Sequence, residues 1–236
     1  MVSLTVSDEI LNPAATLRFR FHKVGALQYI SHLDLVRTLT KVIVRAGLPV
    51  WYTEGFNPKP RLSFATPMSV GLESECEFLD LKINRHVNTE AVREAFNRNL
   101  TAECAADEVY YPTSKFTEIG YSSYEFRIRT AGDAALLAGQ AENLLRNGPC
   151  VVLKRSKSGE KETDIRPMIR TARAAGEGEW ITVSAVLSAN GERFLNPEYI
   201  VTLLKEKLGI LGGDPLWERY SILRTGTYFE DMTPFR

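Results

Sequence analysis

The sequence predicts an α+β protein in which one order of strands and helices occurs twice. Short stretches that alternate apolar and polar residues indicate half-buried strands, and longer stretches with apolar residues three or four positions apart indicate helices. The two kinds of stretch follow each other in the same order in both halves of the chain. With 236 residues, 44% of them hydrophobic, the chain can bury a core in one large domain or in two small ones.

The first domain is predicted over residues 16–113, after a polar lead-in at residues 1–15. Strict alternation at residues 17–22 predicts its first strand, with one apolar and one cationic face. The apolar face holds Leu17, Phe19 and Phe21, and the cationic face holds Arg18, Arg20 and His22.

A helix is predicted next, with Ser31 as its N-cap and Gly47 as its C-terminal stop. Its apolar stripe consists of Leu33, Val36, Leu39, Val42 and Ile43. Basic residues spaced by four form a column on the exposed side: Arg37, Lys41 and Arg45.

A proline-rich loop after this helix is predicted to be stiff and exposed. Pro58 and Pro60 flank Lys59, so this lysine has little conformational entropy left to lose on binding. Arg61 follows directly, where strand-like alternation resumes.

The remaining elements complete the repeated order. In the first half they are a strand at residues 77–83, a helix capped by Thr89 and an extended segment at residues 100–111. In the second half they are extended segments at residues 124–129, 150–155, 180–187 and 217–224, with helices beginning at Asp133 and Asn196. This order is that of two tandem ferredoxin-like (βαββαβ) domains with antiparallel sheets, at residues 16–113 and 123–230, joined by a linker at residues 114–122 and followed by a tail at residues 231–236. A single larger α+β domain is the alternative.

Positive charge is concentrated in two segments, although the formal net charge of the chain is zero. Residues 16–61 hold eight basic residues against two acidic ones, and residues 151–173 hold seven against three. The net charge argues against a wholly basic nucleic-acid module. The uneven distribution suggests an anionic partner on one face.

Metal, cofactor and membrane sites are not indicated. Cys76, Cys104 and Cys150 lie far apart and form no CxxC pair, which favours reduced core thiols. We expect no metal and no cofactor in this chain. No apolar run approaches the ~20 residues of a membrane-spanning helix and residues 1–15 do not resemble a signal peptide, so we expect a cytoplasmic protein without a membrane partner.

Catalytic motifs are also scarce. The phosphate-binding loop, the dinucleotide fingerprint, the zinc-protease motif and the serine-hydrolase elbow are absent from the sequence. The best acid/base candidates are His22 and His32, which can meet where the first strand leads into the first helix. The sequence therefore favours a protein that is not an enzyme, and we expect that any enzyme activity would act on RNA.

The face of each sheet that the helices leave uncovered can meet a partner, a second domain or single-stranded RNA. The candidate RNA-binding residues combine the basic strand faces, the helix column, the two basic segments and two aromatic residues able to stack on a base: Arg18, Arg20, Lys23, Arg37, Lys41, Arg45, Tyr52, Phe56, Lys59, Arg61, Arg127, Arg129, Lys154, Arg155, Arg166 and Arg170. The alternative is that the two sheets pack together, or that the strand arginines pair with Glu75, Glu77, Asp80 or Glu125.

Several unrelated short motifs occur in one order along the chain. They are Phe21-His22-Lys23, Tyr29-Ile30-Ser31-His32-Leu33-Asp34, Arg45-Ala46-Gly47-Leu48-Pro49, Gly55-Phe56-Asn57-Pro58-Lys59-Pro60 and Gly71-Leu72-Glu73-Ser74, with Asp164-Ile165-Arg166-Pro167 and Arg224-Thr225-Gly226 further on. In these motifs the chain resembles the radical SAM-linked protein family, a bacterial domain of unknown function that occurs alone or fused to the C-terminus of cobalamin-binding-type radical SAM proteins. The resemblance implies an accessory role beside a radical SAM enzyme that carries the S-adenosylmethionine and the iron–sulfur cluster. The family's gene neighbours, ribosomal proteins and a ribonuclease, hint at RNA modification.

The leading hypothesis is an RNA-binding, substrate-presenting partner of a radical SAM enzyme that modifies tRNA or rRNA. One alternative is a metal-independent endoribonuclease, because the tandem layout also resembles CRISPR repeat-processing enzymes, in which a histidine can act as general base. Residues 209–213 are only a weak match to the glycine-rich loop of such nucleases. A third hypothesis is a protein-interaction scaffold that never meets RNA. The nucleotide, the RNA class and the oligomeric state stay open.

Overall fold

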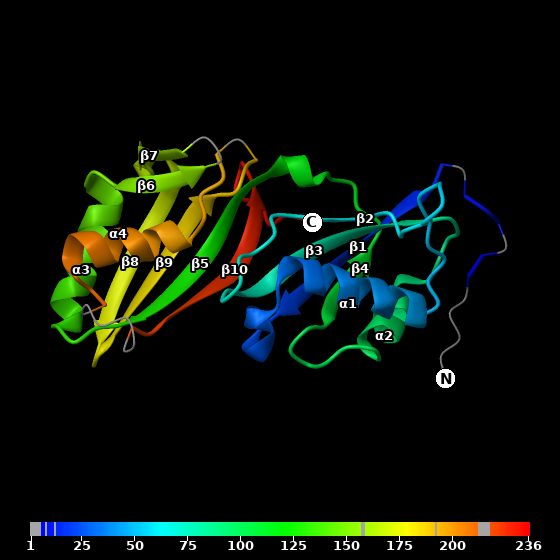
Figure 1. The fold of residues 1–236 in the computed structure, drawn as a ribbon, viewed down its shortest axis with the longest axis horizontal. Helices are drawn as coiled ribbons and strands as arrows, with labels where there is room; N and C mark the ends of the chain where they lie inside the picture. Colours follow the sequence, from blue (N-terminus) through cyan, green and yellow to red (C-terminus); the bar gives the residue numbers. More distant parts are fainter. Residues whose placement is uncertain (1–5, 8, 12, 157–158, 192, 212–217) are drawn as a thin grey trace. The chain divides into compact units, whose positions relative to one another are not determined.

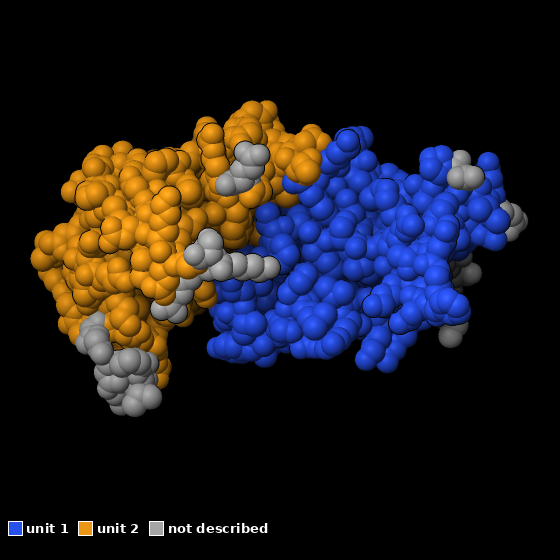
Figure 2. Space-filling view, turned by 45° about the horizontal axis from the view of Figure 1, so that its top comes forward, with its two compact units in different colours: residues 1–116, 236 blue, residues 117–235 orange. Residues whose placement is uncertain are grey.

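The computed structural model describes residues 6–7, 9–11, 13–156, 159–191, 193–211 and 218–236. The chain forms two compact units, shown in separate colours in Figure 2. Unit 1 consists of residues 1–116 together with Arg236, and unit 2 consists of residues 117–235. Among the described residues, no helix is both long and apolar enough to cross a bilayer.

Unit 1 is an antiparallel sheet with two α-helices on one face (Figure 1). Its elements are β1 (Ala15–Lys23), η1 (Gly25–Tyr29), α1 (His32–Arg45), β2 (Leu62–Phe64), β3 (Glu73–Ile83), α2 (Thr89–Asn97) and β4 (Ala106–Tyr110). Strand β1 pairs with β4 on one side and β3 on the other, and β2 pairs with the far side of β3. The core lies between this sheet and the helices, where Leu17, Phe19 and Phe21 of β1 are fully buried as predicted.

Helix α1 begins where the sequence predicts, because the Ser31 side chain accepts a hydrogen bond from the Asp34 N–H at 3.1 Å. Its buried stripe differs by one position from the prediction. Leu35 is buried, whereas Leu33 is 57% exposed. The two residues lie about 200° apart around a helix, so both cannot face the sheet, and the stripe continues from Leu35 to Leu39.

Unit 2 is likewise built on antiparallel strands with two α-helices on one face (Figure 1). Its elements are η2 (Phe116–Glu118), β5 (Ile119–Arg129), α3 (Ala134–Asn147), β6 (Val151–Ser156), β7 (Gly159–Asp164), η3 (Arg166–Met168), β8 (Ile169–Glu177), β9 (Trp180–Ser188), α4 (Glu198–Leu208) and β10 (Tyr220–Phe229). Strand β5 lies between β10 and β9, and β8 pairs with the outer side of β9. Strands β6 and β7 form a separate two-stranded hairpin.

The hairpin corrects one element of the prediction. The extended segment at residues 150–155 pairs with β7 and not with the main sheet, where β8 takes its place. Strand β8 has little strand-forming character because it is rich in alanine and includes Gly176. Packing requires glycine at one of these positions, since a Cβ atom on Gly176 would lie 2.1 Å from the backbone oxygen of Ala134 in α3. The chain is therefore α+β with antiparallel sheets, as predicted, while the tandem ferredoxin-like assignment stays a prediction.

Two predicted RNA-binding cations of β1 are buried instead. Arg18 is fully buried and forms a two-point ion pair with Asp80 of β3, at 2.6 and 2.8 Å, and it also donates to the Ser114 hydroxyl at 2.8 Å. Its guanidinium lies 4.4 Å from the centre of the Phe116 ring. Lys23 is 3% exposed and donates to the Leu72 carbonyl at 2.9 Å. Both side chains are engaged within unit 1, so neither is available to RNA.

Asp80→Ala should lower the free energy of unfolding by about 3 kcal/mol or more, because it leaves Arg18 buried without its carboxylate. Urea unfolding of the full chain measures the change. Glu90→Ala is the control, since it removes a carboxylate from the exposed pair with Arg93 and should cost far less. Equal losses in the two variants would show that the buried pair does not hold unit 1 together.

Candidate nucleic-acid interface

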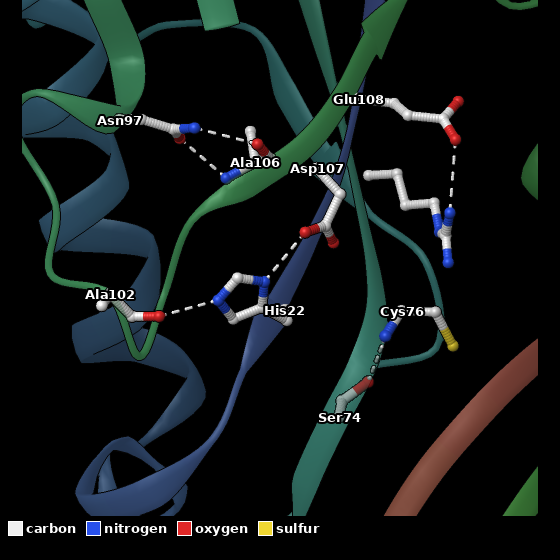
Figure 3. A network of polar contacts seen from close by, with 9 residues as sticks. His22, Ser74, Cys76, Asn97, Ala102, Ala106, Asp107 and Glu108 are labelled. Atoms are coloured by element: carbon white, nitrogen blue, oxygen red, sulfur yellow. Dashed lines mark hydrogen bonds and ion pairs between the residues drawn. The ribbon is translucent and has the colours of Figure 1, made fainter. Parts of the chain in front are cut away.

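His22 lies in a network of polar contacts on the β1–β4 side of unit 1 (Figure 3). Its Nδ1 lies 3.0 Å from Asp107 Oδ1, and its Nε2 lies 2.9 Å from the Ala102 carbonyl oxygen. The side chain of Asn97 bonds both backbone groups of Ala106, which ties the end of α2 to the residue before Asp107. Two acceptors face the ring, so the arrangement suits an imidazolium that donates from both nitrogens.

The electrostatics of this network agree with that protonation state. Burial by itself lowers the pKa of His22. The hydrogen bond to Ala102, the hydrogen bond to Asp107 and the negative charges of Asp107 and Glu75 all raise this pKa, and together they outweigh burial. The pKa of His22 is therefore raised above its ordinary value of 6.5. A general base needs a free ring nitrogen, so this geometry does not support the prediction of His22 as a catalytic residue.

His32 is the first residue of α1, and its ring stands edge-on to Phe64 at 5.2 Å between ring centres. It is exposed to solvent. The contacts of His22 and His32 involve different parts of unit 1, and no described contact joins the two histidines.

The open sheet face around His22 carries both signs of charge. A shallow cavity of about 390 Å³ is lined by Arg20, His22, Val24, Glu75 and Asp107. Arg20 is partly exposed and pairs with Glu108 at 3.3 Å. Glu108 is not among the carboxylates predicted to pair with the strand arginines, whereas the Arg18–Asp80 pair is one of the predicted pairings. This face of unit 1 is not uniformly cationic.

The proline-rich loop at residues 52–61, which we call the Phe56 loop, is the most exposed candidate. Backbone bonds close its base: the Thr53 N–H donates to the Lys59 carbonyl at 2.8 Å, and the Lys59 N–H donates to the Thr53 hydroxyl at 3.0 Å. Gly55 has a φ of 119°, which favours glycine, in the turn before Phe56. The Phe56 side chain is fully exposed, and Tyr52 is 42% exposed. Lys59 and Arg61 are also exposed, so the loop presents the aromatic and basic groups predicted for it.

The basic column of α1 also faces solvent. Arg37 pairs with Asp34 at 2.9 Å, one turn earlier in the helix. Lys41 and Arg45 are exposed and have no ion-pair partner among the described residues. These two side chains remain available to an anionic partner.

In unit 2, the predicted cations of β5 lie on the sheet face opposite the buried Phe126 and Ile128. Arg127 stacks on the ring of Trp180, with its guanidinium carbon 4.6 Å from the ring centre. Arg129 instead forms an ion pair with Glu179 at 2.8 Å.

Four further candidates lie elsewhere in unit 2. Arg170 stacks on Tyr121 at 4.9 Å, and Lys154 lies 5.7 Å from the centre of the Tyr199 ring. Arg166 donates to the carbonyl oxygens of Arg146 and Ile169, both at 2.7 Å, which gives it a structural role. Arg155 lies in β6, but its side chain is outside the described part of the chain.

A larger groove in unit 2 adds residues that sequence reasoning missed. It has a volume of about 640 Å³ and is lined by residues of β5, α3, η3, β8, β9 and β10. The missed lining residues that bear on ligand binding are Ser123, Arg146, Arg173 and Thr225. The basic segment at residues 151–173 was a signal for Arg173. The position of Arg173 in the groove depends on the pairing of β8 with β9, which the sequence did not predict.

Among the described residues, no group of three His, Cys, Asp or Glu side chains is placed to hold a metal ion. Cys76, Cys104 and Cys150 are buried and form no disulfide. Burial, together with the charge of Glu77, raises the pKa of Cys104 to about 12, so this thiol stays protonated and unreactive at neutral pH.

Comparisons with known proteins give one family match. Residues 16–197 match a family described as "Uncharacterized protein conserved in bacteria (DUF2344)". No curated protein matches the chain. Among solved structures, an unknown protein from Galdieria sulphuraria shares 7% identity, with 89% of this chain and 98% of that chain covered and a TM-score of 0.26. DyPB from Rhodococcus jostii RHA1 shares 10% identity, with 84% and 85% covered and a TM-score of 0.20. These TM-scores are too low to establish a shared fold.

Asp107→Asn should lower the pKa of His22, because the variant removes the carboxylate charge beside the ring. The pKa of His22 is higher in the folded protein than the ordinary 6.5 of an unfolded chain, so the Asp107–His22 interaction stabilises the fold fully below about pH 6.5 and is lost as the pH rises through the folded pKa. The variant should thus lose more stability at about pH 5 than at about pH 9. NMR titration of the His22 ring and urea unfolding at both pH values measure the two effects.

Asp34→Asn provides the control for this titration, since Asp34 contacts Ser31 and Arg37 on α1 and does not contact His22. A His22 pKa that is the same in Asp107→Asn as in the wild type would contradict the assigned pairing.

Proposed function

We propose that this chain, which belongs to the bacterial family DUF2344, is an RNA-binding accessory protein that presents RNA to a radical SAM modification enzyme. The single observation that carries RNA binding is the Phe56 loop. It combines an exposed aromatic ring with two exposed cations on a segment whose base is closed by hydrogen bonds.

The exposure of the Phe56 ring favours binding of a ligand that can stack on it. Burying a phenylalanine side chain stabilises a folded protein by about 1.5–3 kcal/mol. Because Phe56 is fully exposed, its side chain contributes none of this stabilisation. Stacking of an unpaired base on an aromatic ring recovers much of it and accepts any base, because every base has a π face. Tyr52 lies in the same segment and forms an isolated bridge with Pro60. The loop therefore suits a single-stranded or looped-out region of RNA.

The cations beside this ring supply the second part of RNA recognition. Lys59 and Arg61 follow Phe56 within five positions, and each can neutralise a phosphate next to a stacked base. Lys41 and Arg45 of α1 provide further exposed positive charge in unit 1. Binding that uses these groups is electrostatic and weakens with salt.

We also propose that each unit is a variant of the ferredoxin-like fold. The order β10-β5-β9-β8, with α3 after β5 and α4 after β9, supports this assignment for unit 2, in which the β6–β7 hairpin is an insertion. The order β4-β1-β3, with β2 beside β3, supports it for unit 1. Open sheet faces of such domains commonly bind single-stranded RNA.

The link to a radical SAM enzyme rests on the sequence resemblance. In this proposal the partner enzyme supplies the S-adenosylmethionine and the iron–sulfur cluster, and this chain supplies RNA recognition in the cytoplasm. The polar network of His22 then has a structural role, since it ties β1 to β4 and to the residues after α2.

RNA binding should weaken steeply with salt, with a slope of about 0.7 in log affinity against log salt for each phosphate that is neutralised on a single strand. The double variant Lys59→Ala and Arg61→Ala should reduce that slope by about 1.4. Phe56→Ala should instead weaken binding by about 1–3 kcal/mol without changing the slope. Filter binding to total tRNA and rRNA over a salt series measures both quantities.

Tyr29→Ala is the matched control for Phe56→Ala, because Tyr29 is an aromatic residue of unit 1 that is 70% exposed and lies outside the loop. No salt-dependent affinity for any RNA would reject the RNA-binding role and leave the scaffold hypothesis. RNA cleavage by the pure protein that is abolished by His22→Ala or His32→Ala would favour the endoribonuclease instead.

A native pull-down of the full chain should copurify a radical SAM protein, identified by mass spectrometry, together with a limited set of RNAs, identified by sequencing. The enzyme should remain bound after ribonuclease treatment, because an accessory protein contacts its enzyme directly. Recovery of RNA without any radical SAM protein in repeated pull-downs would reject the accessory role while leaving RNA binding intact.

A further inference from the structure

The groove of unit 2 is lined by residues of four strands, several of which point to the sheet face opposite the buried Phe126 and Ile128. Strand register aligns Glu125 of β5 with Ser184 of β9, and Ser184 with Arg173 of β8, in one row on this face. Ser123, Val186 and Thr171 form the neighbouring row. The groove therefore runs across four strands, from β10 to the edge strand β8, and includes the end of α3 and η3 in its lining.

Two irregularities in the strands shape the ends of this groove. The register of β8 against β9 shifts between Ile169 and Thr171, beside Arg170. The register of β10 against β5 shifts between Arg224 and Gly226, which brings the Thr225 hydroxyl to 2.8 Å from that of Ser123. Bulges of this kind bend a strand and re-aim its side chains, and they are common next to binding sites.

Glycine is required at the β10 irregularity. A Cβ atom on Gly226 would lie 2.4 Å from the Tyr228 hydroxyl oxygen and 2.8 Å from the Ser123 hydroxyl oxygen. The absence of a side chain at Gly226 therefore allows the Ser123 hydroxyl to lie beside that of Thr225, where both can contact a ligand in the groove.

Positive charge converges on the groove from three elements. The lining includes Arg146 from α3, Arg166 from η3, and Arg170 and Arg173 from β8, against a single carboxylate, Glu125. Two of these arginines are already engaged. Arg146 pairs with Glu142 at 2.9 Å, and Arg166 donates to two carbonyl oxygens.

Arg170 and Arg173 are the arginines that remain available. Both are exposed, and neither has an ion-pair partner among the described residues. The guanidinium of Arg170 is held over the Tyr121 ring, and stacking of this kind leaves its N–H groups free to donate. Arg173 lies across β9 from Glu125, in the same row as Ser184.

This set of groups matches a phosphoryl group better than a simple carboxylate. Guanidinium groups bind phosphate oxygens through paired N–H donors, and the serine and threonine hydroxyls of the groove can donate to the remaining oxygens. Glu125, two strands away from Arg173, is an acceptor suited to a sugar hydroxyl or a base amino group. The volume of about 640 Å³ is within the usual range for small-molecule sites.

We propose that the unit 2 groove is a nucleotide-phosphate site, in which Arg170 and Arg173 bind the phosphoryl group of a nucleotide that is either free or part of an RNA strand. The site is independent of the Phe56 loop, since every residue that lines it belongs to unit 2. It would give the chain a second point of contact with a nucleic acid, or a binding site for a free nucleotide.

Titration of the full chain with inorganic phosphate, AMP, and a short RNA with and without a 5′-phosphate tests this site. Arg170→Gln and Arg173→Gln should each weaken binding of the preferred ligand at least about tenfold, because each removes charge-assisted hydrogen bonds to phosphate. Arg219→Gln is the control, since Arg219 is an exposed arginine of unit 2 that does not line the groove. Circular dichroism and the thermal midpoint of each variant confirm that it is folded.

The arms of this titration separate the two sources of the phosphate. Equal affinity for AMP and RNA supports a free-nucleotide site, and tighter binding of RNA that is lost in the two arginine variants supports contact with a strand. The proposal would be overturned if Arg170→Gln and Arg173→Gln bound every ligand as tightly as Arg219→Gln does. It would also be overturned if the wild-type protein bound none of the four ligands. The RNA affinity of Phe56→Ala over the salt series tests the Phe56 loop separately. Failure of one site therefore does not imply failure of the other.

Discussion

The alternation of side chains along antiparallel strands is the constraint on which both units depend. Each sheet buries one set of side chains against two helices, so every intervening residue is directed to the opposite face. In β5, burial of Phe126 and Ile128 requires Glu125 and Arg127 to point away from the helices. A shift in register by one residue would bury these charges, so the apolar core also determines which polar groups meet solvent.

Both units hold their strand arginines with carboxylates and with aromatic rings, since Arg18 also stacks on Phe116 and Arg129 pairs with Glu179. In unit 1, Arg18 pairs with a carboxylate and is covered by the segment that holds Ser114, and Arg20 pairs with Glu108. In unit 2, Arg127 and Arg170 stack on the aromatic rings of Trp180 and Tyr121. An ion pair uses the N–H donors of a guanidinium, whereas stacking orders the group and leaves those donors available. On the open face of unit 2, the stacked Arg127 and Arg170 therefore keep donors available, whereas Arg129 does not.

The two candidate surfaces differ in the kind of recognition they allow. The Phe56 loop projects an aromatic ring and neighbouring cations from a base closed by hydrogen bonds, which suits contact with an extended or flexible ligand. The unit 2 groove brings side chains from several elements toward one volume, which suits a compact charged group. Under the proposed function, an RNA that contacted both surfaces would bind with a higher effective affinity than one that contacted either alone.

Local pattern by itself determined the α+β class, the apolar face of β1, the cap of α1 at Ser31 and the exposure of the Phe56 loop. These features depend on residues close together in the chain, whose spacing and conformational preferences are visible in the sequence. Only the tertiary structure decided the burial of Arg18 and Lys23, the place of β8 in the sheet and the convergence of arginines on the unit 2 groove. Each of these depends on contacts between distant segments: Asp80 and Ser114 reach Arg18, and Gly176 fits beneath α3. Because β8 is rich in alanine and has a glycine where α3 packs against it, its own sequence carries little sign of the strand it forms.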